Sequence, residues 1–129
     1  MSARVPFEYA IVRVVPRVER GESINAGVIV YCRERDFLGA RALLDADRLR
    51  SLDPGADVEA ITAALHSLTE TCAGTDGPAA GEDIGRRFRW LTAPRSTVVQ
   101  PGPVHTGLTD DPQAALDRLV DVLVRAVRS

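Results

Sequence analysis

The residues best suited to chemistry lie in a stretch rich in proline and glycine near residue 100. A guanidinium with neighbouring hydroxyls can bind a phosphate group, and a histidine can exchange a proton near pH 7. A histidine without a catalytic partner is more often structural, so we assign no catalytic residue. The anion-binding candidates of this stretch are Arg95, Ser96, Thr97, Gln100 and His105.

A second set of anion-binding candidates lies in a polar segment nearer the N-terminus. Arg17 and Arg20 can offer planar donor forks to a phosphate, and Gly21 lets the backbone come close to a ligand. The same segment allows a structural alternative, in which Arg20 pairs with Glu22 and closes a turn. The spacing does not decide between the two.

Other reaction classes are excluded by what the sequence lacks. All 16 basic residues are arginine, so neither a lysine-containing phosphate-binding loop nor a Schiff base can form. Cys32 and Cys72 stand far apart without a C-x-x-C motif, and His66 and His105 form no H-E-x-x-H motif. Neither of these common zinc patterns is present, and we expect no metal site and no cofactor.

The length of the chain, 129 residues, predicts a single domain over residues 1–129. Hydrophobic residues make up 45% and charged residues 26% of the chain, which is typical of a globular protein, and the formal net charge is −2. The net charge argues against a nucleic-acid partner. No apolar run is long enough for a signal segment or a membrane span, so we expect a cytoplasmic protein with reduced thiols and no membrane contact.

Strands must position most of these candidates. Segments rich in β-branched residues and separated by short polar links predict an antiparallel meander within residues 7–44. Its strands are expected at residues 7–15, 24–33 and 37–44. A short fourth strand is expected at residues 96–100, followed by an irregular loop. The predicted fold class is α+β, with a three- to four-stranded antiparallel sheet.

Helices are expected to cover one face of this sheet. Asp45, Asp57 and Asp111 are suitable N-caps, and the helix after Asp57 carries a regular apolar stripe. The C-terminal helix has its own stripe, which ends at Val127. We expect these two helices on the same face, where small apolar side chains alternate along the strands. The expected helical ranges are 45–52, 57–73, 82–91 and 111–127.

The other face of the sheet combines aromatic, aliphatic and arginine side chains. This composition is typical of the centre of a protein interface. Two alternatives stay open: the C-terminal half could fold over this face and pair the arginines with carboxylates, or the aromatic side chains could stack nucleic-acid bases. The partner-binding candidates on this face are Tyr9, Arg13, Asn25, Ile29, Tyr31 and Arg41.

Several motifs resemble a family of small bacterial proteins classed as a domain of unknown function. The likeness extends over nearly the whole chain and includes Tyr9-x-x-Val12-Arg13-x-Val15-Pro16, Arg20-Gly21-Glu22-x-x-Asn25-x-Gly27-Val28, Phe88-Arg89-Trp90-Leu91, Pro94-Arg95-Ser96-Thr97 and Val104-His105-x-Gly107. The resemblance implies a fold and transfers no mechanism. It also implies genes beside kinases of the HipA toxin type, which favours a protein partner.

Together these observations predict a small, cytoplasmic, non-enzymatic interaction protein. Its mixed sheet face would bind a protein partner, either a second copy of the chain in a homodimer or a HipA-like kinase. The alternative is a phosphate- or nucleotide-binding domain or enzyme that uses the Arg/Ser/Thr/His cluster near residues 95–106.

Overall fold

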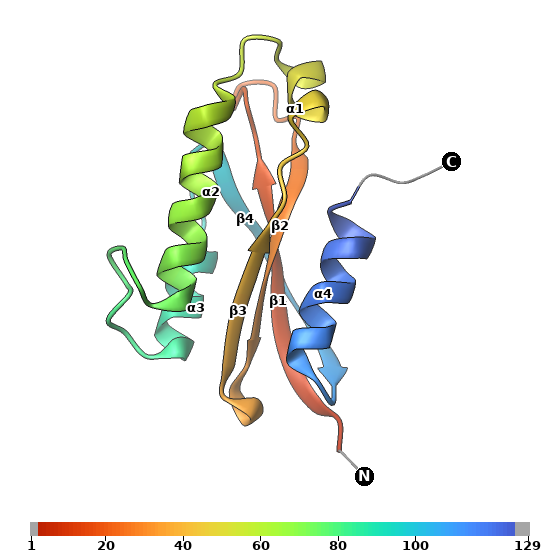
Figure 1. Cartoon of the computed structure of the whole chain (residues 1–129), viewed down its shortest axis with the longest axis vertical. Helices are drawn as coiled ribbons and strands as arrows, with labels where there is room; N and C mark the ends of the chain where they lie inside the picture. Colours follow the sequence, from red (N-terminus) through yellow and green to blue (C-terminus); the bar gives the residue numbers. More distant parts are fainter. Residues whose placement is uncertain (1–2, 126–129) are drawn as a thin grey trace.

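The computed structural model describes residues 3–125, which form one four-stranded sheet and four α-helices (Figure 1). All neighbouring strands are antiparallel, in the order β3-β2-β1-β4. This arrangement confirms the α+β class, the antiparallel sheet and the C-terminal helix. The elements are β1 (Val5–Val14), β2 (Ile24–Cys32), the 3-10 turn η1 (Arg33–Arg35), β3 (Phe37–Ala42), α1 (Ala46–Leu52), α2 (Val58–Ala73), α3 (Ile84–Thr92), β4 (Val99–Thr109) and α4 (Pro112–Leu123).

An aspartate begins each of the four α-helices. The side chains of Asp45, Asp57, Asp83 and Asp111 each accept a hydrogen bond from a backbone N–H in the first turn. These bonds satisfy donors that have no partner within the helix. The part of the C-terminal stripe predicted at Val127 lies outside the described residues. No helix within residues 3–125 has the length and hydrophobicity that a membrane crossing requires.

The fourth strand is longer than the sequence predicted. It continues to Thr109, so the prediction of an irregular loop after residue 100 was wrong. Pro101 and Pro103 fit because β4 is an edge strand, where a missing N–H need not break a ladder bond. The pairing of β1 with β4 shifts by one residue between Ala10 and Val12, which places an extra residue in β4 beside the prolines.

A β-bulge in β2 changes which side chains share a face of the sheet. Arg13 pairs with Asn25, but Val12 pairs with Gly27, so Ala26 is an extra residue opposite β1. From this bulge to the end of β2, each side chain lies on the opposite face from the one that simple alternation along the strand predicts. The predicted faces of the side chains in this part of β2 were therefore wrong.

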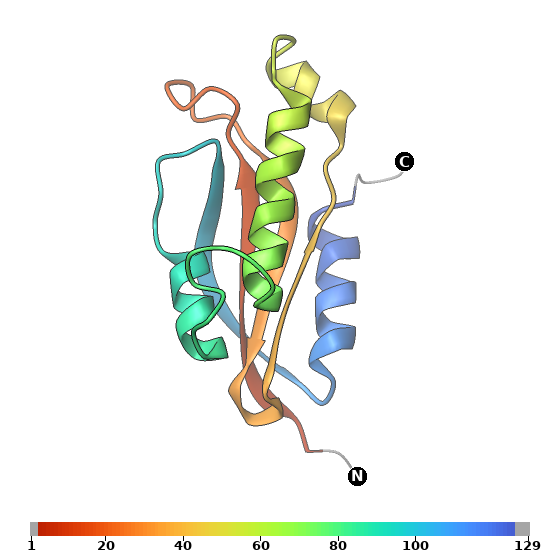
Figure 2. The same ribbon diagram turned by 60° about the vertical axis from the view of Figure 1, so that its left-hand side comes forward.

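Helices lie on both faces of the sheet (Figures 1 and 2). α2 and α3 pack on the face that carries Ile29, named the α2 face, and α4 packs on the face that carries Val28 and Val30, named the α4 face. The prediction that the C-terminal helix shares a face with α2 was wrong. The reason is that β2 is a central strand with apolar side chains on both faces, and each face needs a cover.

Candidate functional site

α4 covers only part of its face of the sheet. It packs over β2 and β3, where Asn25 Nδ2 donates to the carbonyl oxygen of Leu123 at 2.9 Å and Arg41 pairs with Asp117 at 2.9 Å. Over β1 and β4 the face is less covered, so Ile11 stays partly exposed on a central strand. This patch, named the open sheet surface, consists of Tyr9, Ile11, Arg13, Gln100 and His105, with Asn25 at its border beside the end of α4.

Arg13 lies at the centre of the polar end of the open sheet surface. It is paired across the strands with Asn25 on β2 and with Gln100 on β4. A Cβ atom added to Gly102 would lie 3.3 Å from Arg13 Cζ, so the guanidinium lies against the backbone of β4. Arg13 is half-buried and forms no salt bridge within residues 3–125. A partly desolvated cation of this kind is stabilised when an acceptor approaches it.

A row of aromatic rings lies on the same face. The ring centroids of Phe7 and Tyr9 are 5.8 Å apart, and those of Tyr9 and His105 are 5.3 Å apart. Phe7 is buried and His105 is exposed, so the row leads from the core to solvent. Tyrosine at such a border offers apolar contact area together with a polar hydroxyl.

The structure places Tyr9, Arg13 and Asn25 together on the open sheet surface, as the sequence predicted. Arg41 is on the same face of β3, but it belongs to the part that α4 covers and its guanidinium is already paired with Asp117. Sequence reasoning did not assign Gln100 to this surface. Finding it requires the register of β4, which the prolines obscured.

Ile29 and Tyr31 are not on the open sheet surface. Both lie on the α2 face, so the prediction that they join Arg13 was wrong. Ile29 is fully buried, and the ring of Tyr31 stacks on Phe88 at a centroid distance of 5.2 Å. The bulge in β2 is the cause, because it reverses the alternation after Asn25.

The arginines of the N-terminal anion-binding set are paired with carboxylates. Arg17 lies 3.5 Å from a carboxylate oxygen of Asp53 and 3.7 Å from one of Glu19. Arg20 donates from Nε to Glu22, and this hydrogen bond raises the pKa of its guanidinium. This pairing matches the structural alternative for the segment, in which Arg20 and Glu22 close a turn.

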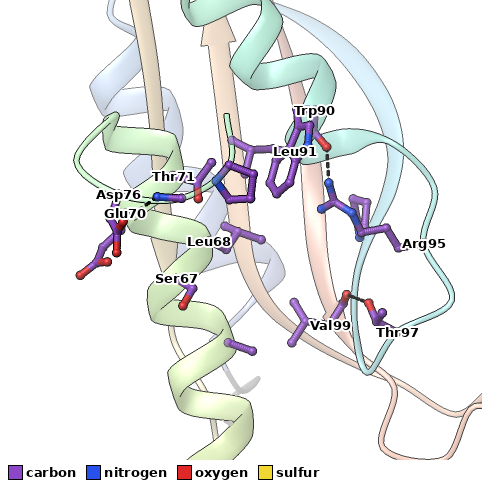
Figure 3. A pocket seen from close by; sticks show the side chains of 14 residues that line it. Ser67, Leu68, Glu70, Thr71, Asp76, Trp90, Leu91, Arg95, Thr97 and Val99 are labelled. Carbon is purple, nitrogen blue, oxygen red and sulfur yellow. Dashed lines mark hydrogen bonds between the residues drawn. The ribbon is translucent and has the colours of Figure 1, made fainter. Parts of the chain in front are cut away.

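The second anion-binding set is divided between the two faces of the sheet. Gln100 and His105 belong to the open sheet surface, opposite Arg13 and Tyr9 on β1. Arg95 and Thr97 instead line a hollow of about 380 Å³ on the α2 face (Figure 3). Ser96 is exposed. These residues therefore do not converge on one anion.

The described part of the chain assembles no metal-binding centre, and its two cysteines are buried. Within residues 3–125 no three metal-ligating side chains gather. Cys32 and Cys72 are free and buried. Burial raises the pKa of the Cys72 thiol to about 11, against a smaller opposing effect of the Arg87 charge, and a protonated thiol is a poor nucleophile. His66 Nε2 lies 2.7 Å from Glu70 on an exposed surface of α2.

Comparison with known families matches residues 9–124 to the family described as "Protein of unknown function (DUF3037)". Neither the curated proteins nor the solved structures gave a match. The matched range begins within β1 and ends directly after α4, so it includes most of the sheet and all four described α-helices. The chain belongs to the DUF3037 family of proteins of unknown function.

Proposed function

We propose that the chain is a cytoplasmic, non-enzymatic interaction protein whose open sheet surface binds an acidic region of a partner protein. The observation that carries this proposal is the half-buried Arg13, which lies among Tyr9 and Ile11 without a carboxylate partner within residues 3–125. The free, buried thiols of Cys32 and Cys72 support a reducing compartment.

The residue types of this surface suit a protein contact. Tyrosine and arginine are enriched among the residues that contribute most to interface affinity. A carboxylate can form a planar, bidentate pair with Arg13, while Ile11 supplies apolar area beside it. Gln100 and His105 add hydrogen-bonding groups. A stable interface buries about 800 Å² on each side, so the contact would extend beyond these residues.

The charge of the surface favours a different protein over a second copy of the chain. Arg13 and His105 are its titratable basic groups, and none of its residues is acidic, although the chain as a whole has a formal net charge of −2. In a symmetric dimer the surface would face itself, so neither Arg13 would meet a carboxylate from the other copy's surface. A HipA-like kinase, which the motif resemblance suggested, is one candidate partner if it presents carboxylates.

The phosphate- or nucleotide-binding alternative has less support. Its residues are divided between the α2 face, with Arg95 and Thr97, and the open sheet surface, with Gln100 and His105. A single phosphate cannot contact both groups through the sheet.

The test is the Arg13→Glu variant of the full chain. Tagged wild-type chain is used to isolate a partner from lysate of the source cells, and the purified partner is then titrated against each variant. Reversing the charge of an interfacial arginine should weaken binding by at least about tenfold. Arg89→Glu, an exposed arginine of α3 on the α2 face, is the matched control and should leave the affinity unchanged.

Two other outcomes would overturn the proposal. A partner that binds wild type and Arg13→Glu equally tightly does not use this surface. A dimer of wild-type chain in sedimentation equilibrium that Arg13→Glu dissociates would assign the surface to a second copy. We expect a monomer of 13.9 kDa and melting temperatures of both variants close to that of wild type.

A further inference from the structure

A separate hollow lies on the α2 face, on the opposite side of the sheet from the open sheet surface. It is bounded by α2, the segment after α2, the end of α3, the segment before β4 and the start of β4, and its volume is about 380 Å³ (Figure 3). This volume falls within the range of small-molecule sites in proteins. It is independent of the proposed partner contact.

The interior of the hollow is apolar. Leu68 of α2 and Val99 and Pro101 of β4 line it as half-buried side chains. Trp90, the only tryptophan of the chain, forms part of the wall and keeps 38% of its surface exposed. An exposed indole beside an apolar floor is a surface that an apolar ligand can cover.

Arg95 places one positive charge at this apolar site. Its guanidinium carbon lies 4.2 Å from the centre of the Trp90 ring, and Nη2 donates to the carbonyl oxygen of Trp90. Arg95 is half-buried and forms no salt bridge within residues 3–125. The cation–π contact and the hydrogen bond fix the plane of the guanidinium, and its other N–H groups are free to donate.

Another part of the wall, the segment after α2, is held close to α2 by a glycine. Gly77 has φ of +113°, and a Cβ atom there would lie 2.1 Å from Thr71 Oγ1. Only glycine permits this approach. The carboxylates of Glu70 and Asp76 belong to the same wall, but both point away from Trp90 in Figure 3. The acidic groups therefore lie at the outside of the hollow, apart from the arginine.

We propose that this hollow binds an organic monocarboxylate with an apolar body. The apolar body would lie on Leu68, Val99 and Trp90, and the carboxylate would accept hydrogen bonds from Arg95. A single guanidinium matches one carboxylate in charge and in its fork of donors. Inorganic phosphate carries more charge and no apolar surface, so this site offers it little.

The single tryptophan makes the site directly observable. The full chain is titrated with octanoate, with 1-octanol and with inorganic phosphate while the emission of Trp90 is recorded, and affinities are checked by calorimetry. Octanoate should shift the emission saturably to shorter wavelength. The neutral alcohol should bind at least about tenfold more weakly, because it lacks the charge-assisted hydrogen bonds. Phosphate should cause no saturable change.

Two variants separate the charge from the apolar body. Arg95→Gln should reduce octanoate affinity to that of 1-octanol and leave 1-octanol binding unchanged, whereas Arg89→Gln, which does not line the hollow, should bind octanoate like wild type. Ser67→Phe places a ring at the wall and should weaken both ligands. Ala63→Phe, on the exposed surface of α2 outside the hollow, should weaken neither.

The proposal fails under three results. The first is the absence of saturable octanoate binding to wild type. The second is unchanged octanoate affinity in Arg95→Gln, or unchanged affinity for both ligands in Ser67→Phe. The third is equal binding of octanoate and phosphate, which would mark Arg95 as a general anion contact.

Discussion

At the scale of single residues, Tyr31 and Tyr9 show how the face of the sheet that a side chain occupies decides whether it belongs to a core or to a surface. Its ring stacks on Phe88 on the α2 face, and a Cβ atom added to Gly85 would lie 3.1 Å from the Tyr31 hydroxyl oxygen. Tyr9, on the other side of the sheet, instead contacts the exposed His105. Tyr31 therefore belongs to a core, whereas Tyr9 belongs to the open sheet surface.

Replacing Tyr31 by alanine should lower the free energy of unfolding by about 2–4 kcal/mol, because the aromatic contact is lost and a cavity remains. Tyr31→Phe keeps the ring and should stay within about 0.5 kcal/mol of wild type. Urea denaturation of both variants measures the difference. A Tyr31→Ala variant with wild-type stability would contradict the position of this ring in the α2-face core.

Cys72 gives a pH dependence with a definite sign. Burial raises the pKa of its thiol from 9.0 to about 11, so between these values the unfolded chain loses the proton and the folded chain keeps it. The stability is fully present below pH 9 and should then fall as pH rises, by at most about 1.4 kcal/mol per pH unit. Urea denaturation at a series of pH values should show this slope in wild type. The Cys72→Ala variant should lack that contribution, and equal slopes in both proteins would refute it.

At the scale of elements, β4 is an edge strand with one side of its backbone unpaired within the described sheet. The N–H of Val15 donates to the carbonyl oxygen of Val98 at 2.7 Å. The backbone N–H and C=O groups of a strand alternate in direction, so those of every second residue of β1 before Val15 also point to β4. His105 and Gly107 lie opposite two such residues, Tyr9 and Phe7, and their N–H groups therefore bond to β1. The N–H groups of the residues beside them in β4 point away from the sheet.

Hydrogen exchange should reveal this alternation. The amides of His105 and Gly107 should be protected, while those of Val104, Thr106 and Leu108 should exchange rapidly, because their N–H groups face away from β1. Exchange measured residue by residue with NMR would test it. Uniform protection along β4 would show that another strand pairs with this edge, and uniform exchange would show that the strand is not formed.

Local sequence signals were enough to predict most elements. Asp45, Asp57 and Asp111 begin helices as expected, because a capping side chain acts on backbone groups only a few residues away. The length of β4 could not be predicted in the same way. Pro101 and Pro103 read as loop residues until the strand is known to lie at an edge, and that is a property of the whole sheet.

Two parts of the candidate site could be predicted from the sequence: residues that share a face of a single strand, and residues of β2 that precede the bulge. Tyr9 and Arg13 share a face of β1 by simple alternation, and Asn25 joins them because it lies on the near side of the extra residue. Gln100 reaches Arg13 through the register of β4. That register depends on a pairing between segments far apart in the chain, and no local pattern records it.

At the scale of the whole molecule, one sheet separates two cores. α2 and α3 close one core, α4 closes the other, and strands β1 and β2 contribute to both (Figure 1). The open sheet surface and the Trp90 hollow consequently lie on opposite sides of the same strands. A protein partner and a small ligand could occupy them at the same time, and neither contact would cover the other.

The bulge in β2 has a consequence for how the chain tolerates changes of length. Removing Ala26 would leave Gly27 opposite Val12 and Asn25 opposite Arg13, so every other side chain keeps its face. Removing a residue from Val28–Tyr31 would put part of the strand out of phase and exchange side chains between the two cores. We therefore expect this chain to keep both cores when β2 is shortened at the bulge, but not when a residue is removed elsewhere in the strand.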